Sequence, residues 1–151
     1  MSGLESAFGI SFPDFAILCT DQSKLQSIIV QKTDEDKITE LAPKILLAAV
    51  GESGDCKNFS ELIARNYSLY SLRNSRDLST AAIGNFIRNE LATALRKGPY
   101  STNLLLAGVE EESGGEEAVA SLYYIDYLAT MHKTKFAAHG FCKCEPVEVL
   151  V

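Results

Sequence analysis

Two apolar segments in the last third of the chain, residues 103–108 and 121–128, constrain the fold more than any other feature. An acidic, glycine-containing stretch at residues 110–117 lies between them. Short apolar runs bounded by turn-forming residues are typical of buried strands, and a polar connection of this kind joins two strands into a hairpin. The pattern therefore predicts a β-hairpin with a solvated loop. The loop is not expected to bind calcium, because it lacks the alternating ligand spacing of a calcium site.

The first third of the chain also has the pattern of strands. Phe8, Ile10 and Phe12 alternate with small or polar residues, which is the period-two signal of a half-buried strand. Pro13 and Asp14 break this pattern and predict a tight turn. The further strands that the sequence predicts lie at residues 15–19, 27–31, 37–41 and 45–50.

The middle third predicts two helices. Apolar residues recur at helical spacing over residues 59–70 and again over residues 83–95. Ser53 or Asp55 is expected to cap the first helix and Ser79 the second, and Gly98-Pro99 is expected to end the second. Strands followed by two helices and then by strands indicate an α+β domain in which helices pack on a sheet.

Composition excludes several classes of protein. The chain has 151 residues, enough for one domain with a sizeable core, and a net charge of −6 without any run of lysine or arginine. Nucleic acid and anionic membranes are therefore not expected as partners, and no apolar stretch is long enough to span a bilayer. The first residues lack the features of a secretory signal, so we expect a cytoplasmic or nuclear location.

The four cysteines are expected to be free thiols in a reducing compartment. Cys142 and Cys144 form a C-x-C sequence near His139, and His132 is the only other histidine. This spacing matches no standard zinc pattern, so the sequence predicts neither a metal site nor a cofactor.

Several short segments of the chain carry a family resemblance through their order and spacing. They lie at residues 20–21, 30–31, 36–37, 44–47, 50–52, 54–55, 69–70, 73–74, 78–79, 99–100, 103–108, 123–124, 126–129 and 136–140. In order and spacing they resemble segments of the proteasome beta subunits. The chain thus resembles this family over roughly residues 5–140, and among its members it resembles the non-catalytic ones. The resemblance implies an αββα four-layer sandwich of the N-terminal-nucleophile-hydrolase kind, with the two helices above forming one layer.

The resemblance divides the chain into a beta-subunit domain at residues 1–140 and a tail at residues 141–151 that departs from the family. The family continues beyond this point with further helices and strands. The second helical layer is therefore expected to be incomplete in this chain, and one face of a sheet is expected to expose apolar residues to water.

Active members of the family use a processed N-terminal threonine, whose hydroxyl attacks and whose α-amine acts as the base. Family spacing places Asp21 and Lys37 at the positions of the family's site aspartate and lysine, and it places Glu5 at the threonine position. A carboxylate cannot replace that hydroxyl nucleophile. Asp21 and Lys37 are accordingly expected to be remnants of a degenerate site.

Two further differences from the active members of the family also indicate a degenerate site. Ser23 stands where active members usually carry arginine, and His139-Gly140-Phe141 replaces a small hydroxyl-bearing turn. An active threonine-type endopeptidase would need another nucleophile. Ser2, exposed by loss of Met1, lies too early for the pocket, and Ser6 would require cleavage after a residue that is not glycine.

The function implied by the resemblance is therefore structural. The chain is expected to be a non-catalytic subunit of the 20S core particle, which degrades unfolded, often ubiquitin-marked proteins. Its implied partners are the neighbouring alpha and beta subunits of a four-ring, 28-subunit complex, together with assembly chaperones. The alternatives are a truncated form that does not complete ring assembly and, less favoured because of Glu5, an active peptidase.

Overall fold

The computed structural model describes residues 5–26, 29–110 and 118–140. Ten strands and two helices occur in these residues. The elements, in chain order, are β1 Ser6–Ser11, β2 Ala16–Thr20, β3 Lys24–Gln26, β4 Ile29–Lys32, β5 Ile38–Ala42, β6 Ile45–Gly51, α1 Ser53–Asn74, α2 Thr80–Ala94, β7 Thr102–Glu110, β8 Val119–Ile125, β9 Met131–Thr134 and β10 Phe136–Gly140.

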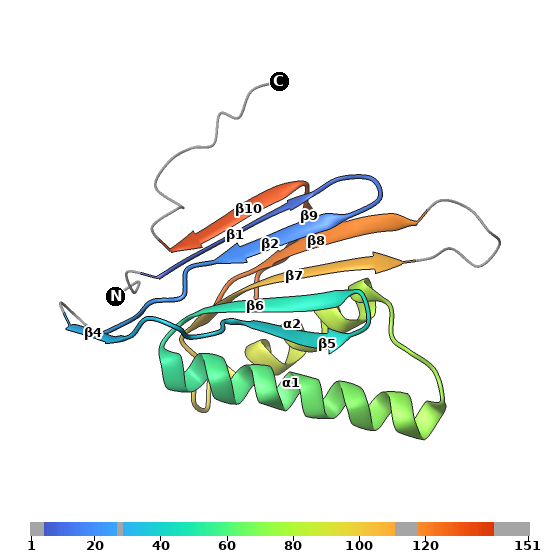
Figure 1. Cartoon of the computed structure of the whole chain (residues 1–151). Coiled ribbons are helices and arrows are strands. Elements are labelled where there is room, and N and C mark those ends of the chain that lie inside the picture. The colour runs from blue at the N-terminus through green and yellow to red at the C-terminus, as the bar shows by residue number, and fades with distance from the viewer. Residues whose placement is uncertain (1–4, 27–28, 111–117, 141–151) are drawn as a thin grey trace.

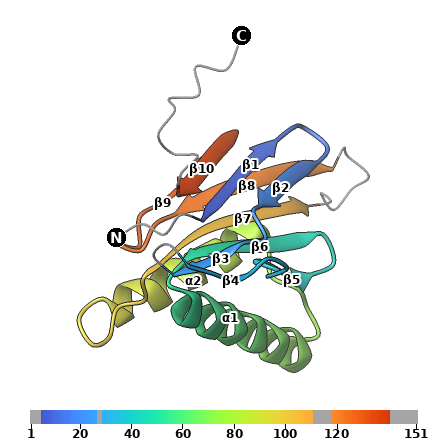
Figure 2. The ribbon, with the colours of Figure 1, turned by 60° about the vertical axis from the view of Figure 1, so that its left-hand side comes forward.

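The described residues form three layers. The larger sheet has five antiparallel strands in the order β5-β6-β7-β8-β9, and the smaller sheet has three in the order β10-β1-β2. The smaller sheet lies on one face of the larger sheet, and both helices lie on the opposite face (Figure 1). Figure 2 shows the same order of layers from another side. No helix covers the outer face of the smaller sheet within the part of the chain that the structure describes.

The predicted apolar segment at residues 103–108 is the centre of this arrangement. It lies in β7, and every residue from Leu104 to Gly108 is buried. Because side chains alternate across a strand, Leu104 and Leu106 join the core beneath the helices, whereas Leu105 and Ala107 join the core between the two sheets. A strand with cores on both sides needs a continuous apolar run, which explains why this segment carries no alternation.

Both predicted helices are present, but one predicted cap is wrong. Glu52, not Ser53 or Asp55, caps α1, and its Oε2 accepts a hydrogen bond of 2.8 Å from the N–H of Asp55. Glu52 lies just before the helix, where its carboxylate can accept from a free N–H of the first turn, whereas Ser53 and Asp55 are already inside the helix. Ser79 caps α2 as predicted, with its hydroxyl accepting from the N–H of Ala82.

A glutamate from the sheet also binds the start of α2. The carboxylate of Glu110, at the end of β7, accepts a hydrogen bond from the N–H of Thr80. Thr80 is fully buried and packs against Gly108, where a Cβ atom would lie 2.3 Å from the threonine Oγ1. The absence of a side chain at Gly108 thus lets α2 approach β7 closely. The rest of the predicted acidic loop, residues 111–117, lies outside the described residues.

Two strand predictions need correction, and three further strands were not predicted. The strand predicted at residues 27–31 is β4, which pairs with an unpredicted β3 in a separate two-stranded ribbon, and residues 27–28 lie outside the described part. The strand predicted at residues 121–128 ends at Ile125, because the Asp126 carboxylate binds the N–H groups of Leu128 and Thr130 and forms a turn. Strands β9 and β10 were not predicted at all, since both are short and mostly polar or composed of small residues.

Candidate functional site: a closed ion-pair cluster

Glu5, Asp21 and Lys37 come together at one end of the smaller sheet. Glu5 precedes β1, and Asp21 follows β2, so the antiparallel pairing of β1 with β2 places the two side by side. Ser6 and Asp21 are joined by two hydrogen bonds, from the Ser6 N–H to Asp21 Oδ1 at 2.9 Å and from the Asp21 N–H to the Ser6 carbonyl at 3.1 Å. Lys37 lies directly before β5, an edge strand of the larger sheet, and its side chain reaches Glu5 and Asp21.

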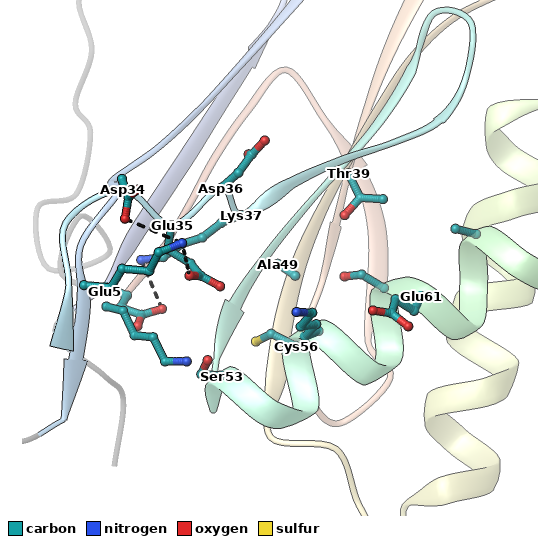
Figure 3. A pocket seen from close by; sticks show the side chains of 15 residues that line it. Glu5, Asp34, Glu35, Asp36, Lys37, Thr39, Ala49, Ser53, Cys56 and Glu61 are labelled. Atoms are coloured by element: carbon teal, nitrogen blue, oxygen red, sulfur yellow. Dashed lines mark ion pairs between the residues drawn. The ribbon is translucent and has the colours of Figure 1, made fainter.

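The ammonium group of Lys37 has three oxygen partners. Its Nζ lies 3.1 Å from Glu5 Oε2, 2.9 Å from Asp21 Oδ1 and 2.7 Å from the carbonyl oxygen of Ser23. A lysine ammonium has three N–H donors, so these partners can satisfy all of them. Figure 3 shows Glu5 and Lys37 facing each other on one wall of a cavity. The carbonyl of Ser23 was missed at the sequence level, because only its side chain was considered there.

This cluster is largely removed from water. The side chains of Lys37 and Glu5 are only 5% and 7% exposed, and that of Asp21 is 29% exposed. A buried ammonium is tolerated only when carboxylates and hydrogen bonds replace its hydration. The residue at the predicted nucleophile position thus acts here as a counterion to Lys37.

Strand β10 fixes the main chain of Glu5. Gly140 pairs with Ser6 and has a φ of +75°, and a Cβ atom on Gly140 would lie 1.8 Å from the carbonyl oxygen of Glu5. Only glycine accommodates both the conformation and this close approach. The neighbouring His139 is buried between the sheets, where its Nε2 lies 3.1 Å from the carbonyl oxygen of Leu104 and its ring stacks on Tyr124. Phe141, which was predicted to replace part of the family's hydroxyl-bearing turn together with His139 and Gly140, lies outside the described residues.

A cavity of about 410 Å³ opens beside the cluster. One wall carries Glu5 and Lys37, the opposite wall is the first half of α1, and Thr39 and Ala49 lie between them (Figure 3). At the rim, Lys32 forms ion pairs with Asp34 at 3.5 Å and with Glu35 at 3.1 Å. The hydrogen bond and charge of Lys32 hold the pKa of Glu35 below its usual value.

Cys56 also lines this cavity, and sequence reasoning did not single it out as a site residue. Its thiol lies 3.2 Å from the hydroxyl of Thr102. Burial raises the pKa of Cys56 to about 11, so the thiol is protonated at neutral pH. Because the thiolate is the reactive form of cysteine, Cys56 is a poor nucleophile here.

Metal ligands do not cluster in the described residues. Residues 5–26, 29–110 and 118–140 contain no group of three or more histidine, cysteine, aspartate or glutamate side chains that could hold an ion. Cys142 and Cys144 lie outside these ranges. Over the same ranges, neither α1 nor α2 is long and apolar enough to cross a membrane.

The two-sheet sandwich, with Lys37 and Asp21 meeting at Glu5 just before β1, defines the class of protein, the N-terminal-nucleophile-hydrolase fold. Comparison with known proteins identifies the family within that class. Residues 2–147 match the family described as proteasome subunit, and the chain belongs to that family.

The similar curated proteins include beta subunits from plants and from an amoeba. The chain is 51% identical over 138 residues to proteasome subunit beta type-2-A of Arabidopsis thaliana. The matched residues make up 91% of this chain and 65% of that relative. It is also 51% identical to proteasome subunit beta type-2 of Oryza sativa, over 91% of this chain and 63% of that protein. The corresponding protein of Dictyostelium discoideum is 51% identical over 83% of this chain and 63% of its own length. The chain therefore spans slightly less than two thirds of these three relatives.

Proposed function

We propose that the chain is a non-catalytic structural subunit of the beta ring of the 20S core particle. The observation that carries this proposal is the Glu5 carboxylate, which lies at the predicted nucleophile position and contacts Lys37 at 3.1 Å. Catalysis of this type needs a hydroxyl or thiol nucleophile with a nearby base. Glu5 has neither a hydroxyl nor a thiol, and its carboxylate holds Lys37 in an ion pair.

The main-chain contacts of Glu5 add support. A processed N-terminus at Ser6 would remove the Glu5 carboxylate that now neutralises Lys37, and it would also break the chain where Gly140 packs on the Glu5 carbonyl. Retaining Glu5 preserves both contacts. An active peptidase with Ser6 as its nucleophile is therefore disfavoured.

The expected partners follow from the family. A ring subunit would contact neighbouring alpha and beta subunits, and assembly chaperones during its incorporation. We infer a cytoplasmic and nuclear location and a role in the breakdown of ubiquitin-marked proteins, because those are the expectations for the core particle. Support for the beta class comes from the beta type-2 names of the relatives.

A second candidate function is a form that does not complete ring assembly. The exposed apolar outer face of the smaller sheet favours it, since Phe8 and Phe136 are 47% and 53% exposed there. Such a face would promote other contacts in place of the ring contacts.

Native sizing of the tagged chain from a cell lysate, with mass spectrometry of the co-migrating proteins, tests the two candidates. Co-migration with alpha and beta subunits at the size of a complete core particle supports the structural role. A chain found only as a small species or with chaperones contradicts it and supports the second candidate.

A further inference from the structure

The Glu5–Asp21–Lys37 cluster joins the two sheets. Glu5 directly precedes β1 and Asp21 directly follows β2, so both carboxylates belong to the smaller sheet. Lys37 directly precedes β5 of the larger sheet, and its carbonyl oxygen accepts a hydrogen bond of 3.1 Å from the N–H of Ala49 in β6. The main chain of Lys37 is thus fixed by the larger sheet, whereas its ammonium group binds the two carboxylates of the smaller sheet.

Apolar packing between the two sheets is thin. Among the described residues, the core between the sheets has six buried members, of which three are alanines, whereas the core beneath the helices has sixteen. The six are Ala7, Ala48, Val50, Leu105, Ala107 and Leu122. Hydrophobic stabilisation is roughly proportional to the apolar area that is buried. The smaller sheet therefore gains less from apolar burial than the helices do, and polar contacts contribute more to its attachment.

Polar contacts attach the smaller sheet along its length. At the end of β1 away from the cluster, the N–H of Ala120 in β8 donates a hydrogen bond of 2.8 Å to the carbonyl oxygen of Pro13, in the turn between β1 and β2. Nearer the cluster, His139 in β10 lies 3.1 Å from the carbonyl oxygen of Leu104 in β7. The contacts of Lys37 differ from these because they join an ammonium to carboxylates, and charge-assisted hydrogen bonds are roughly twice as strong as neutral ones.

We propose that the Glu5–Asp21–Lys37 cluster is a clamp between the sheets, and that β1, β2 and β10 open from the larger sheet as one unit when the clamp is broken. Strand β1 pairs with each of its two neighbours over five residue pairs, so main-chain hydrogen bonds hold the three strands together when they leave the larger sheet. Cooperative units of this kind open at a lower free energy than the whole domain. The three residues thus have a structural role at the positions predicted for a catalytic site.

Lys37→Met breaks the clamp and leaves a strain that opening relieves. In the closed state the Glu5 side chain is only 7% exposed, and it would lose the cation that lies 3.1 Å away. Once the sheets separate, water solvates the carboxylate. Removal of one partner from a buried ion pair is costly for this reason, and the substitution is expected to shift the opening equilibrium toward the open form at least about a hundredfold.

Native-state hydrogen exchange of the 151-residue chain, at urea concentrations below the unfolding transition, tests the proposal. In the wild type, the amides of β1, β2 and β10 are expected to share one opening free energy that is lower than that of β6 and β7. Their exchange should also depend less on urea, because less surface becomes exposed. Lys37→Met is expected to accelerate this exchange at least about a hundredfold. Lys57→Met is the matched control, since this exposed lysine lines the same cavity, and it is expected to change the exchange little.

Ile87→Val separates opening of the smaller sheet from unfolding of the whole chain. Ile87 is fully buried in the core beneath the helices, which stays packed when the smaller sheet opens. This variant is expected to accelerate exchange in β6 and β7 about three- to tenfold and to leave exchange in β1 and β10 unchanged. Equal opening free energies for both sheets of the wild type, or an equal response of both sheets to Ile87→Val, would overturn the proposal. Exchange in β1 that Lys37→Met does not accelerate would also overturn it.

A milder variant keeps the proposal testable if Lys37→Met does not fold. Asp21→Asn removes one carboxylate and keeps the pair between Glu5 and Lys37. It is expected to accelerate exchange in β1, β2 and β10 more than Lys57→Met does, and no acceleration would contradict the clamp. Ring assembly is tested separately by native sizing, so a failure of the clamp leaves the proposed function standing.

Discussion

Removal of the Lys37 ammonium is the most informative perturbation of the ion-pair cluster. Lys37→Met keeps most of the side-chain volume but leaves the nearly buried Glu5 carboxylate without the cation that lies 3.1 Å away. Breaking a buried pair on one side costs about 3–5 kcal/mol, because the remaining charge stays desolvated. For a chain of this size that loss corresponds to a decrease in Tm of about 6–20 °C.

Urea and thermal unfolding at neutral pH and fixed chain concentration would measure this effect. The double variant Glu5→Gln/Lys37→Met removes the stranded carboxylate and is expected to recover most of the loss. Lys57→Met is the matched control, because Lys57 lines the same cavity but is exposed. Its expected effect is within about 0.5 kcal/mol of the wild type. A Lys37→Met chain that is no less stable than this control would refute the argument that the pair is buried and coupled.

Three other predictions concern contacts elsewhere in the chain. Gly108→Ala would place a Cβ atom 2.3 Å from Thr80 Oγ1, so unfolding measurements should show a loss of about 1–3 kcal/mol, and a smaller loss when Thr80→Ala is already present. Glu110→Gln should cost about 0.5–1 kcal/mol, because it removes a negative charge from the N-terminus of α2; an equal effect of the exposed Glu40→Gln would contradict this. Cys56 has a pKa raised from 9.0 to about 11, so the folded chain keeps a proton that the unfolded chain loses, and its stability should fall by about 2–3 kcal/mol as the pH rises from about 9 to about 11. Cys56→Ala should flatten that part of the pH profile, and an unchanged slope would show that the thiol is not responsible.

Local sequence patterns were enough to predict the helices and the central strands. Leu104 to Gly108 form a continuous apolar run, and such a run predicts a buried strand whatever lies on either side of it. The Ser79 cap was predictable because serine is a preferred residue before a helix. Glu52 was not, since glutamate caps less often and its role depends on the side chain folding back to Asp55.

The short strands were harder to predict. Strand β10 has only small residues, one phenylalanine and one histidine, and it becomes a strand because the distant β1 pairs with it. A long-range contact, rather than local propensity, determines the structure there. The β3–β4 ribbon is a local hairpin, but it belongs to neither sheet and every residue of β4 is exposed, so its pattern carries no burial signal.

The candidate site was only partly accessible to sequence reasoning. Family spacing singled out Glu5, Asp21 and Lys37, but spacing gives no distances and could not show that Lys37 binds both carboxylates. The contribution of the Ser23 carbonyl is a main-chain property that no side-chain pattern reveals. The burial of Cys56 beside the same cavity depends on how α1 packs on the larger sheet.

We propose that this chain has no nucleophile at the position of Glu5. The most direct test is a covalent probe directed at N-terminal threonine, applied to core particles that contain the tagged chain and followed by intact-mass measurement of each subunit. We expect other beta subunits of the particle to gain the probe mass, while this chain keeps Glu5 and gains none. A probe adduct on this chain, at a new N-terminus created by processing, would contradict it.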